Sequence, residues 1–332
     1  MRITVLSGGV GGARFLRGVR GWARDAYPDG AGGTAASVTA IVNTGDDMWL
    51  AGLRITPDLD SVMYTLAGVS DDTRGWGRVG ETERVSAELR AYDVGWPWFT
   101  LGDLDIGTHI ARTHLLRSGL PLSAVTERIT ARWNLGVRVL PATDEEVETW
   151  VEVDSGGGPD GTMHFQEWWT RHRAKLPARA FVQRGADRAT PAPGVVEAIA
   201  DADVILVAPS NPVVSIGTIL GIPGIRAALA AASAPIIGVS PIIGGSVVRG
   251  MADACLVAIG VRTTADAVAV HYGARAGGGL LDAWLIDDAD ATLAPVIEAA
   301  NIRAVVVPLW MSDAATSARL AGEAVAAAAS RP

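Results

Sequence analysis

A glycine-rich loop near the start of the chain has the residue types and spacing of a phosphate-binding turn. It follows a short β-branched run and leads into apolar residues at helical spacing. A helix that begins after such a loop presents unpaired N–H groups and the positive end of its dipole to an anion. A tight strand-to-helix turn that binds nothing is the alternative. The glycines of this loop are Gly8, Gly9, Gly11 and Gly12.

Four aspartates lie in the two segments that follow the next β-branched run, at 38–42. Parallel strands end at the same edge of a sheet, so these acids are expected beside the glycine-rich loop. A bound diphosphate needs charge neutralisation, and Mg²⁺ held by carboxylates and phosphate oxygens supplies it. The alternative is a helix-dipole contact for Asp58 and solvated turn positions for Asp46 and Asp47. The four acids are Asp46, Asp47, Asp58 and Asp60.

Two further loops carry small polar side chains at the ends of predicted strands. Ser210 and Asn211 follow the run 204–207, and the segment from Ser240 to Gly244 follows the run 236–239. Open α/β sheets bind ligands at this edge, so a nucleotide base and ribose are candidate ligands here. Proline-punctuated turns without a ligand are the alternative.

The elements that position these residues alternate between strands and helices. Thr56 as N-cap and Pro57 after it mark the start of a helix, and glycines 156–158 mark a hairpin. From 71 to 133 apolar residues recur at helical spacing without a long β-branched run. Strands are predicted at 3–6, 38–42, 137–140, 204–207, 236–239, 283–286 and 304–307.

This order of elements predicts an α/β fold. We expect a Rossmann-like, doubly wound, mainly parallel sheet in a three-layer arrangement. Residues 1–70 and 134–332 would form the nucleotide-binding core, and residues 71–133 a helical insertion. The sequence shows no internal repeat and no low-complexity tail.

Composition excludes several classes of protein. Of the 332 residues, 49% are hydrophobic and the net charge is −8, so a globular chain is expected without a surface for nucleic acid or anionic membrane. The single lysine, Lys175, excludes a P-loop. The single cysteine, Cys255, excludes a disulfide framework and favours the cytoplasm. The longest apolar stretch, 204–225, is interrupted by polar residues and prolines, which argues against a membrane span.

Seven motifs occur in a fixed order along nearly the whole chain. Together they resemble the CofD/FbiA family, the transferases of deazaflavin coenzyme F420 biosynthesis, with the actinobacterial FbiA branch the most similar. The motifs are Ser7-Gly-Gly-Val-Gly-Gly-Ala-Arg14, Asn43-Thr-Gly-Asp-Asp47, Pro57-Asp-Leu-Asp60, Leu101-Gly-Asp-Leu-Asp105, His164-Phe-Gln-Glu-Trp168, Ala208-Pro-Ser-Asn-Pro212 and Ser240-Pro-Ile-Ile-Gly244.

The resemblance implies a reaction and its partners. A phosphoenolpyruvyl or 2-phospholactyl group would pass from a guanosine-diphospho-activated donor to the ribityl hydroxyl of the deazaflavin Fo, with release of GMP. Mg²⁺ is the implied cofactor, and a homodimer is the implied assembly. The sequence does not decide between the enolpyruvyl and the lactyl donor, because the two groups differ by a few atoms.

The same resemblance implies roles for individual residues. The four glycines would face the diphosphate, and Ser210, Asn211, Ser240 and Gly244 would hold the guanosine. Asp46, Asp47 and Asp60 would bind Mg²⁺ and take part in catalysis, with Asp60 accepting the hydroxyl proton. Asp60, Asp103 and His109 would bind the acceptor. Leu104 stands where many relatives carry arginine, so no acceptor contact is assigned to that side chain.

Two other classes of function are compatible with the opening strand, turn and helix. A nicotinamide oxidoreductase predicts the fingerprint G-x-G-x-x-G, but counting from Gly9 reaches Arg14 where the third glycine belongs. A nucleotide sensor without catalysis uses the same loops but has no need of the aspartates.

Overall fold

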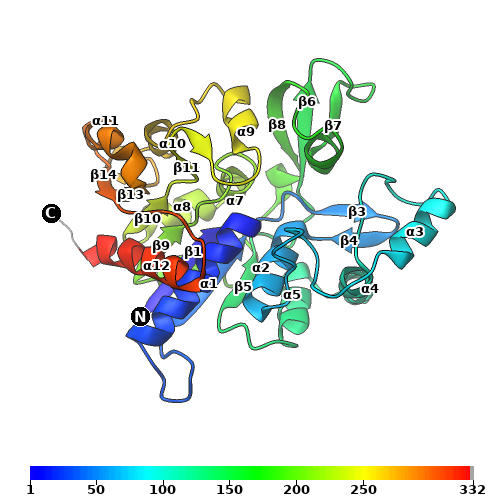
Figure 1. The fold of residues 1–332 in the computed structure, drawn as a ribbon, viewed down its shortest axis with the longest axis horizontal. Coiled ribbons are helices and arrows are strands. Elements are labelled where there is room, and N and C mark those ends of the chain that lie inside the picture. Colours follow the sequence, from blue (N-terminus) through cyan, green and yellow to red (C-terminus); the bar gives the residue numbers. More distant parts are fainter. Residues whose placement is uncertain (330–332) are drawn as a thin grey trace.

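Seven parallel strands form the central sheet of the computed structural model, which describes residues 1–329 (Figure 1). The α/β architecture predicted from the sequence is confirmed. The strands lie in the spatial order β14 (Arg303–Val306), β13 (Ala283–Ile286), β10 (Ile236–Val239), β9 (Val204–Val207), β1 (Arg2–Ser7), β2 (Ser37–Val42) and β5 (Arg138–Pro141).

The strand order reverses direction between β1 and β9. From β1 the chain builds outward through β2 to β5, then returns to the other side of β1 and builds outward again from β9. Leu6 pairs with Val207 across this junction, so β1 and β9 end at the same level. Loops that leave neighbouring strands in opposite directions open a crevice, and ligands of such sheets bind there.

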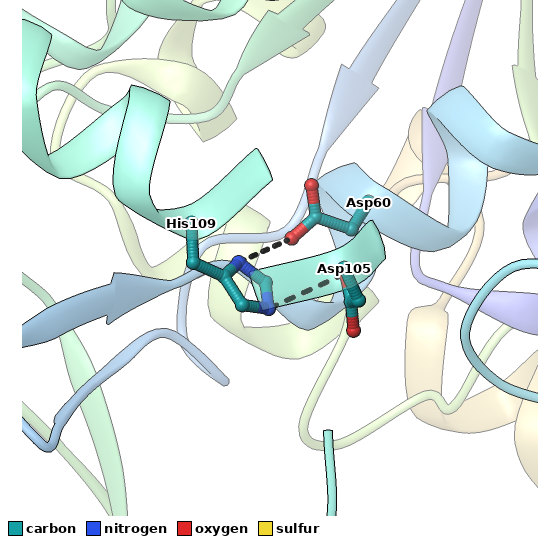
Figure 2. A group of neighbouring side chains, drawn as sticks. All are labelled: Asp60, Asp105 and His109. Atoms are coloured by element: carbon teal, nitrogen blue, oxygen red, sulfur yellow. Dashed lines mark ion pairs between the residues drawn. The ribbon is translucent and has the colours of Figure 1, made fainter. Parts of the chain in front are cut away.

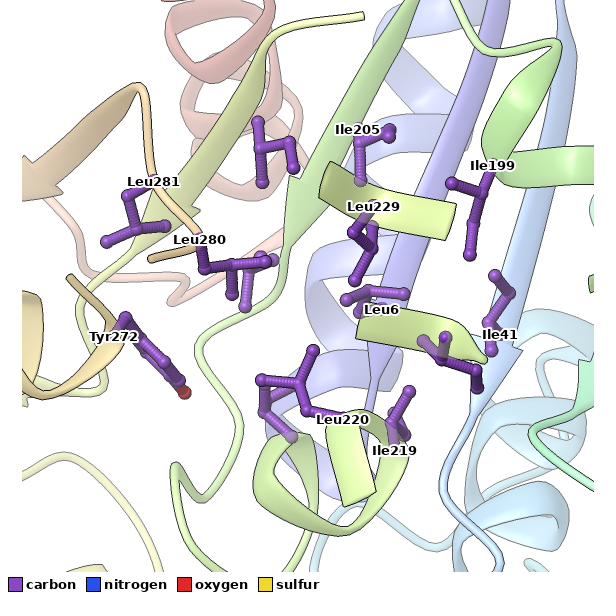
Figure 3. Close-up of a cluster of buried hydrophobic side chains, with 14 of the residues drawn as sticks. Leu6, Ile41, Ile199, Ile205, Ile219, Leu220, Leu229, Tyr272, Leu280 and Leu281 are labelled. Carbon is purple, nitrogen blue, oxygen red and sulfur yellow. The ribbon is translucent and has the colours of Figure 1, made fainter. Parts of the chain in front are cut away.

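Helices cover both faces of the sheet because side chains alternate along each buried strand. In β1, Ile3 and Val5 face one apolar layer, while Leu6 faces the other (Figure 3). The first layer contains α1 (Val10–Ala26), α2 (Pro57–Ala67) and α12 (Ala314–Ala329). The second contains α6 (Val195–Ala200), α7 (Ile216–Gly221), α8 (Ile225–Ala231), α9 (Ala252–Ala258), α10 (Ala265–Tyr272) and α11 (Ala294–Ala299).

Residues 71–133 contain helices and no named strand, as their apolar spacing predicts. They extend to one side of the central sheet together with the hairpin of β3 (Met48–Leu50) and β4 (Leu53–Ile55) (Figure 1). The division of the chain into a core and an insertion stays a prediction. The helices of this region are α3 (Arg84–Ala91), α4 (Asp103–Arg117) and α5 (Leu122–Thr130).

Three small antiparallel sheets stand outside the central sheet. The hairpin predicted around residues 156–158 is confirmed, since β6 pairs with β7 across it. Strands β3, β4, β11 and β12 were not predicted, because runs of two or three residues give no periodicity. The seven-residue strand β8 was not predicted either. The pairs are β3 (Met48–Leu50) with β4 (Leu53–Ile55), β6 (Glu148–Val153) with β7 (Thr162–His164) and β8 (Ala178–Arg184), and β11 (Ile242–Ile243) with β12 (Ser246–Val247).

Two further details complete the fold. Thr56 occupies the predicted N-cap position of α2, but its hydroxyl donates to Asp60 at 3.3 Å and caps no helix N–H. In the described part of the chain, no helix combines the length and apolar character needed to cross a membrane. The short helical turns are η1 (Glu167–Arg171), η2 (Ala186–Arg188), η3 (Arg275–Gly277) and η4 (Asp288–Leu293).

Helices α1 and α12 pack closely where Gly18 faces the Ser317 backbone, and this contact yields a prediction. A β-carbon at Gly18 would collide with the Ser317 carbonyl group. We expect Gly18→Ala to lower the free energy of unfolding by about 1–3 kcal/mol, measured by urea denaturation. Gly21→Ala is the matched control, because a β-carbon there would meet Ala318 Cβ at an ordinary 3.5 Å. It should leave stability unchanged or raise it by up to about 1 kcal/mol. Equal stabilities for the two variants would contradict this packing.

Candidate active site

A central cavity of about 1030 Å³ opens where the carboxyl ends of β1, β9 and β10 meet the loops of residues 71–101. Its volume is at the upper end of the range for a single small-molecule site, so it has room for two substrates. Loops from both halves of the sheet line it, as expected at the point where strand order reverses. Its lining includes Gly9, Val10, Gly11, Asp46, Asp58, Asp60, Tyr64, Asp105, His109, Gln166, Ser210, Asn211, Ser215 and Ser240.

The glycine-rich loop borders the cavity with part of its backbone. Gly9 and Gly11 line the cavity, and no side chain caps the N-terminus of α1 at Gly9. The other two glycines are not in the lining. Gly8 donates its N–H to Ser210 Oγ at 2.9 Å, and a β-carbon at Gly12 would collide with Ser7. The loop therefore needs glycines for packing between β1 and β9 and presents only its centre to a ligand.

Asn43 holds two cavity aspartates together. Its amide nitrogen donates to Asp46 at 3.2 Å and to Asp58 at 2.9 Å. Both carboxyl groups are buried, and a β-carbon at Gly9 would collide with Asp58. Burial, and then the nearby Asp58, raise the pKa of Asp46 well above its usual range. Burial raises the pKa of Asp58 to about 6.

This pair has the chemistry of a hard-cation site. Two buried carboxylates in proximity are costly as anions unless a positive charge joins them. Oxygen donors of this kind are the ligands that Mg²⁺ takes together with phosphate oxygens. The pair lies beside the helix N-terminus, so a cation here would reach a phosphate bound on the loop.

Asp47 has different surroundings from Asp46, although the two are adjacent in sequence. It is fully buried, does not line the cavity, and has its nearest ionic partner in Arg54 at 3.7 Å. Neither of its carboxylate oxygens accepts a hydrogen bond within the described residues. Burial raises its pKa, and Arg54 acts in the opposite direction. Asp47 therefore lies behind the cavity lining, although Asp60 and Asp58 are near enough to raise its pKa further.

Asp60, Asp105 and His109 form a second acidic group at the cavity wall (Figure 2). His109 lies between the two carboxylates, with Nδ1 at 3.6 Å from Asp60 and Nε2 at 3.3 Å from Asp105. One potential ligand atom from each residue lies within 4.8 Å of the others, and all three residues are buried. This is the one such group found among the described residues, and its donors are able to bind a metal ion.

Two neighbours already satisfy much of this group. The guanidinium of Arg112 is buried, pairs with Asp60 and lies 2.9 Å from His109 Nδ1. The Tyr64 hydroxyl donates to Asp105 at 2.7 Å, and His109 together with this bond lowers the pKa of Asp105 against the effect of its burial. Because Arg112 supplies a fixed positive charge, this group needs a cation less than the Asp46–Asp58 pair does.

The polar loops of β9 and β10 border the cavity, but most of their side chains bond within the protein. Asn211 accepts the Val213 N–H at 2.9 Å, and the Ser240 hydroxyl donates to the Ile242 carbonyl at 2.9 Å. Ser210, Asn211 and Ser240 line the cavity, whereas Gly244 does not and donates its N–H to Asp290. These bonds fix the shape of the loops that a nucleotide would contact.

The Leu101–Asp105 motif divides between the cavity and the surface. Asp105 lines the cavity, but Asp103 is not in its lining and accepts the Val85 N–H at 3.1 Å and the Thr82 hydroxyl. The Leu104 side chain is 44% exposed and also lies outside the cavity lining. Asp103 thus joins α3 to α4 outside the cavity lining, and its role in acceptor binding stays a prediction.

Aromatic side chains form another part of the cavity wall. Trp98 and Phe99 line it, and Trp96 supports them by stacking on Trp98 with 4.7 Å between ring centroids. His164 packs against Trp96 at 5.7 Å, and burial lowers its pKa to about 4, so it is neutral at pH 7. A flat aromatic ligand suits such a wall. Further aromatic residues of the lining are Trp76, Phe165, Trp169 and Trp310.

Sequence reasoning named His109 but missed other residues that line or support this cavity. Asp105 lies four residues before His109 in a predicted helical region, a spacing that places both on one helix face and could have identified Asp105. Tyr64 and Arg112 gave no signal, because their roles depend on contacts between α2 and α4.

Comparisons with known proteins agree with this architecture. The family model of the 2-phospho-L-lactate transferase CofD matches residues 3–318. A phosphoenolpyruvate transferase from Thermobifida fusca is 56% identical over 327 residues, which cover 98% of this chain and 97% of that protein. A phosphoenolpyruvate transferase from Streptomyces coelicolor is 54% identical over 325 residues, which cover 98% of this chain and 97% of that protein.

A solved structure gives a fold-level match. A protein member of the UPF0052 family from Bacillus halodurans has a TM-score of 0.62 to this chain, at 16% identity and with 98% of each chain covered. At this identity the likeness concerns the fold alone.

The raised pKa of Asp58 predicts a pH-dependent effect of Asp58→Asn. The folded protein binds the Asp58 proton more tightly than the unfolded chain, so this group destabilises the fold increasingly as pH rises from about 4 through about 6. We expect the stability of the variant relative to the natural protein to increase by about 1–3 kcal/mol from pH 4.5 to pH 7. Urea denaturation in the presence of a chelator measures this difference.

Asp253→Asn, on the exposed surface of α9, is the control for loss of a carboxylate. Its stability relative to the natural protein should vary less with pH. A difference for Asp58→Asn that is constant from pH 4.5 to pH 7 would contradict the prediction.

Proposed function

Because the chain belongs to the CofD family of phosphoryl-group-transferring enzymes, we propose that it transfers a phosphoenolpyruvyl or 2-phospholactyl group to the deazaflavin Fo. The donor would be the corresponding guanosine diphosphate ester, and GMP the leaving group, in coenzyme F420 biosynthesis. The observation that carries the proposal is the buried Asp46–Asn43–Asp58 group beside the open N-terminus of α1. The relatives named phosphoenolpyruvate transferase favour the enolpyruvyl donor.

The donor diphosphate would bind at the centre of the glycine-rich loop. Gly9 and Gly11 border the cavity there, and the first N–H groups of α1 attract negative charge. Gly8 and Gly12 lie outside the cavity lining, where they allow the close packing that holds this turn in place. The loops with Ser210, Asn211 and Ser240 lie along the same side of the cavity and would hold the guanosine, with Gly244 fixing the turn that follows Ser240.

Asp46 and Asp58 would hold Mg²⁺ in contact with the donor phosphates. The sequence prediction named Asp46, Asp47 and Asp60, and we now propose Asp58 in the place of Asp47 because Asp47 lies outside the cavity. When bound, the cation neutralises charge on the phosphate oxygens and polarises the phosphoryl group. Asp60 remains available for the acceptor.

The acceptor would place its ring system along the aromatic wall and its ribityl chain toward Asp60. Asp60 and His109 both line the cavity, and Arg112 holds the Asp60 carboxylate in place. Phosphoryl transfer depends mainly on positioning and charge stabilisation, which such a rigid group supplies. Asp60 would accept a hydrogen bond from the terminal ribityl hydroxyl.

The reaction is a single in-line displacement. The ribityl oxygen forms a bond to the phosphorus that bears the three-carbon acid, while the bond from this phosphorus to the bridging oxygen breaks. The electron pair of the broken bond leaves with GMP, and the hydroxyl proton passes to Asp60.

The implied homodimer and cytoplasmic location stay predictions, as does the absence of nucleic acid and membrane partners.

The family assignment argues against the oxidoreductase alternative. A dinucleotide-binding fold carries an acid at the end of its second strand to bind ribose. Here Asn43 follows β2, and its side chain is bonded to two aspartates. A sensor without turnover is distinguished by the assay below.

The proposed activity predicts release of GMP when the protein is mixed with Fo, the donor and Mg²⁺. Chromatography of the nucleotides measures GMP, and mass spectrometry identifies the product. Formation of GMP should require both Fo and a divalent cation. Donor binding without GMP release would instead support the sensor, and the proposal would then be wrong.

Asp60→Asn tests the role of Asp60 in the transfer step. We expect it to leave GDP affinity within about threefold and to lower kcat by roughly 10²–10⁴-fold, the usual effect of losing a general base. Asp25→Asn, at the exposed end of α1, is the control and should keep the natural kcat. A natural kcat in Asp60→Asn would remove Asp60 from the reaction.

A further inference from the structure

Acidic side chains outnumber basic side chains in the lining of the central cavity. Four aspartates line it, whereas Arg14 and Arg249 are the only arginines or lysines in its described lining. A donor that carries a diphosphate and a carboxylate therefore meets two permanent positive charges in this cavity. Arginine suits a carboxylate because its planar fork donates two parallel hydrogen bonds.

Arg14 lies on α1, three residues after Gly11, which is about one helical turn beyond the phosphate-binding loop. Its Nε is buried and has no hydrogen-bond partner among the described residues. Arg17, one turn further along α1, differs because it pairs with Asp72 at 3.6 Å. Arg14 has no such ion pair within the described chain.

Arg249 reaches the cavity from the segment between β12 and α9, and its guanidinium lies against Gly75. A β-carbon at Gly75 would collide with this guanidinium, and Gly75 has a left-handed φ of 82°. Burial and then the proximity of Arg14 lower the pKa of Arg249, while Asp72 acts in the opposite direction. Two nearby guanidinium groups repel each other, and an anion between them removes that repulsion.

We propose that Arg14 and Arg249 form the subsite for the carboxylate of the three-carbon acid on the donor. This inference rests on the proposed function and assigns both arginines to substrate specificity. The other charged parts of the donor have partners elsewhere, since the α1 N-terminus and a cation on Asp46 and Asp58 neutralise the diphosphate. The aromatic wall takes the acceptor. The carboxylate is the remaining charge, and these arginines are the remaining cations.

Steady-state kinetics on Arg14→Gln and Arg249→Gln test the proposal. We expect each variant to raise the donor KM by about 10- to 100-fold, the effect of losing a hydrogen-bonded charged contact. The inhibition constant of GDP, which has the diphosphate but not the acid, should stay within about threefold. Arg24→Gln, about 15 Å further along α1, is the matched control and should keep the natural donor KM.

A donor analogue isolates the carboxylate. In the isopropenyl ester of GDP, a methyl group replaces the carboxylate of the enolpyruvyl donor. The natural enzyme should bind this analogue more weakly than the donor, and the arginine substitutions should weaken its binding no further. Arg14→Lys and Arg249→Lys keep the charge but lose the planar fork, so their donor KM should lie between those of the natural enzyme and the Gln variants.

Failure of this inference differs from failure of the proposed function. If the natural enzyme releases no GMP from the donor and Fo, the proposed function is wrong. If it does, but the variants keep the natural donor KM, the carboxylate subsite is wrong. A GDP inhibition constant that rises as much as the donor KM would show that the arginines bind the diphosphate, and it too would overturn the subsite. If a Gln variant does not fold, its Lys counterpart decides.

Discussion

Two buried carboxylates beside the N-terminus of α1 impose the constraint that shapes the rest of the site. Asp46 and Asp58 both accept hydrogen bonds from the Asn43 amide. Asp58 can take this position only because Gly9 has no side chain, since a β-carbon there would collide with the Asp58 carboxylate. The same glycine-rich turn must also approach the β9 loop, where Gly8 bonds to Ser210. Each glycine is therefore required by protein packing before any ligand binds. A phosphate site results because this packing leaves the first turn of α1 open to the cavity.

Residues 71–133 are joined to this arrangement by ionic and polar contacts as well as by apolar packing. Arg112 on α4 pairs with Asp60 on α2, and Tyr64 on α2 bonds to Asp105 on α4. Removing one member of a buried pair leaves the other charge without a partner, which costs several kcal/mol. These contacts therefore fix α4 relative to α2. That rigidity suits a reaction whose rate depends on aligning a hydroxyl with a phosphorus atom.

The sequence was sufficient for features that depend on local pattern. The buried runs of the seven-stranded sheet, the glycine turn and the hairpin at 156–158 each have a period or a turn residue that identifies them. The direction in which each side chain points could not be predicted from local sequence pattern. Asp46 and Asp47 are neighbours in sequence, yet one lines the cavity and the other faces Arg54. Arg112 is 52 residues from Asp60, and only the packing of α4 on α2 brings them together.

The cavity combines an acidic lining with a proposed anionic substrate, and burial explains how both are possible. Without a cation, protonation limits the charge on Asp46 and Asp58, as the raised pKa of each indicates. A divalent cation would displace those protons, so cation binding and proton release are linked. The exchange would leave the net charge of this group nearly unchanged and would replace two protons by one metal ion that a phosphate oxygen can bind. If a diphosphate binds there, the cation and the donor would be mutually dependent ligands of one site.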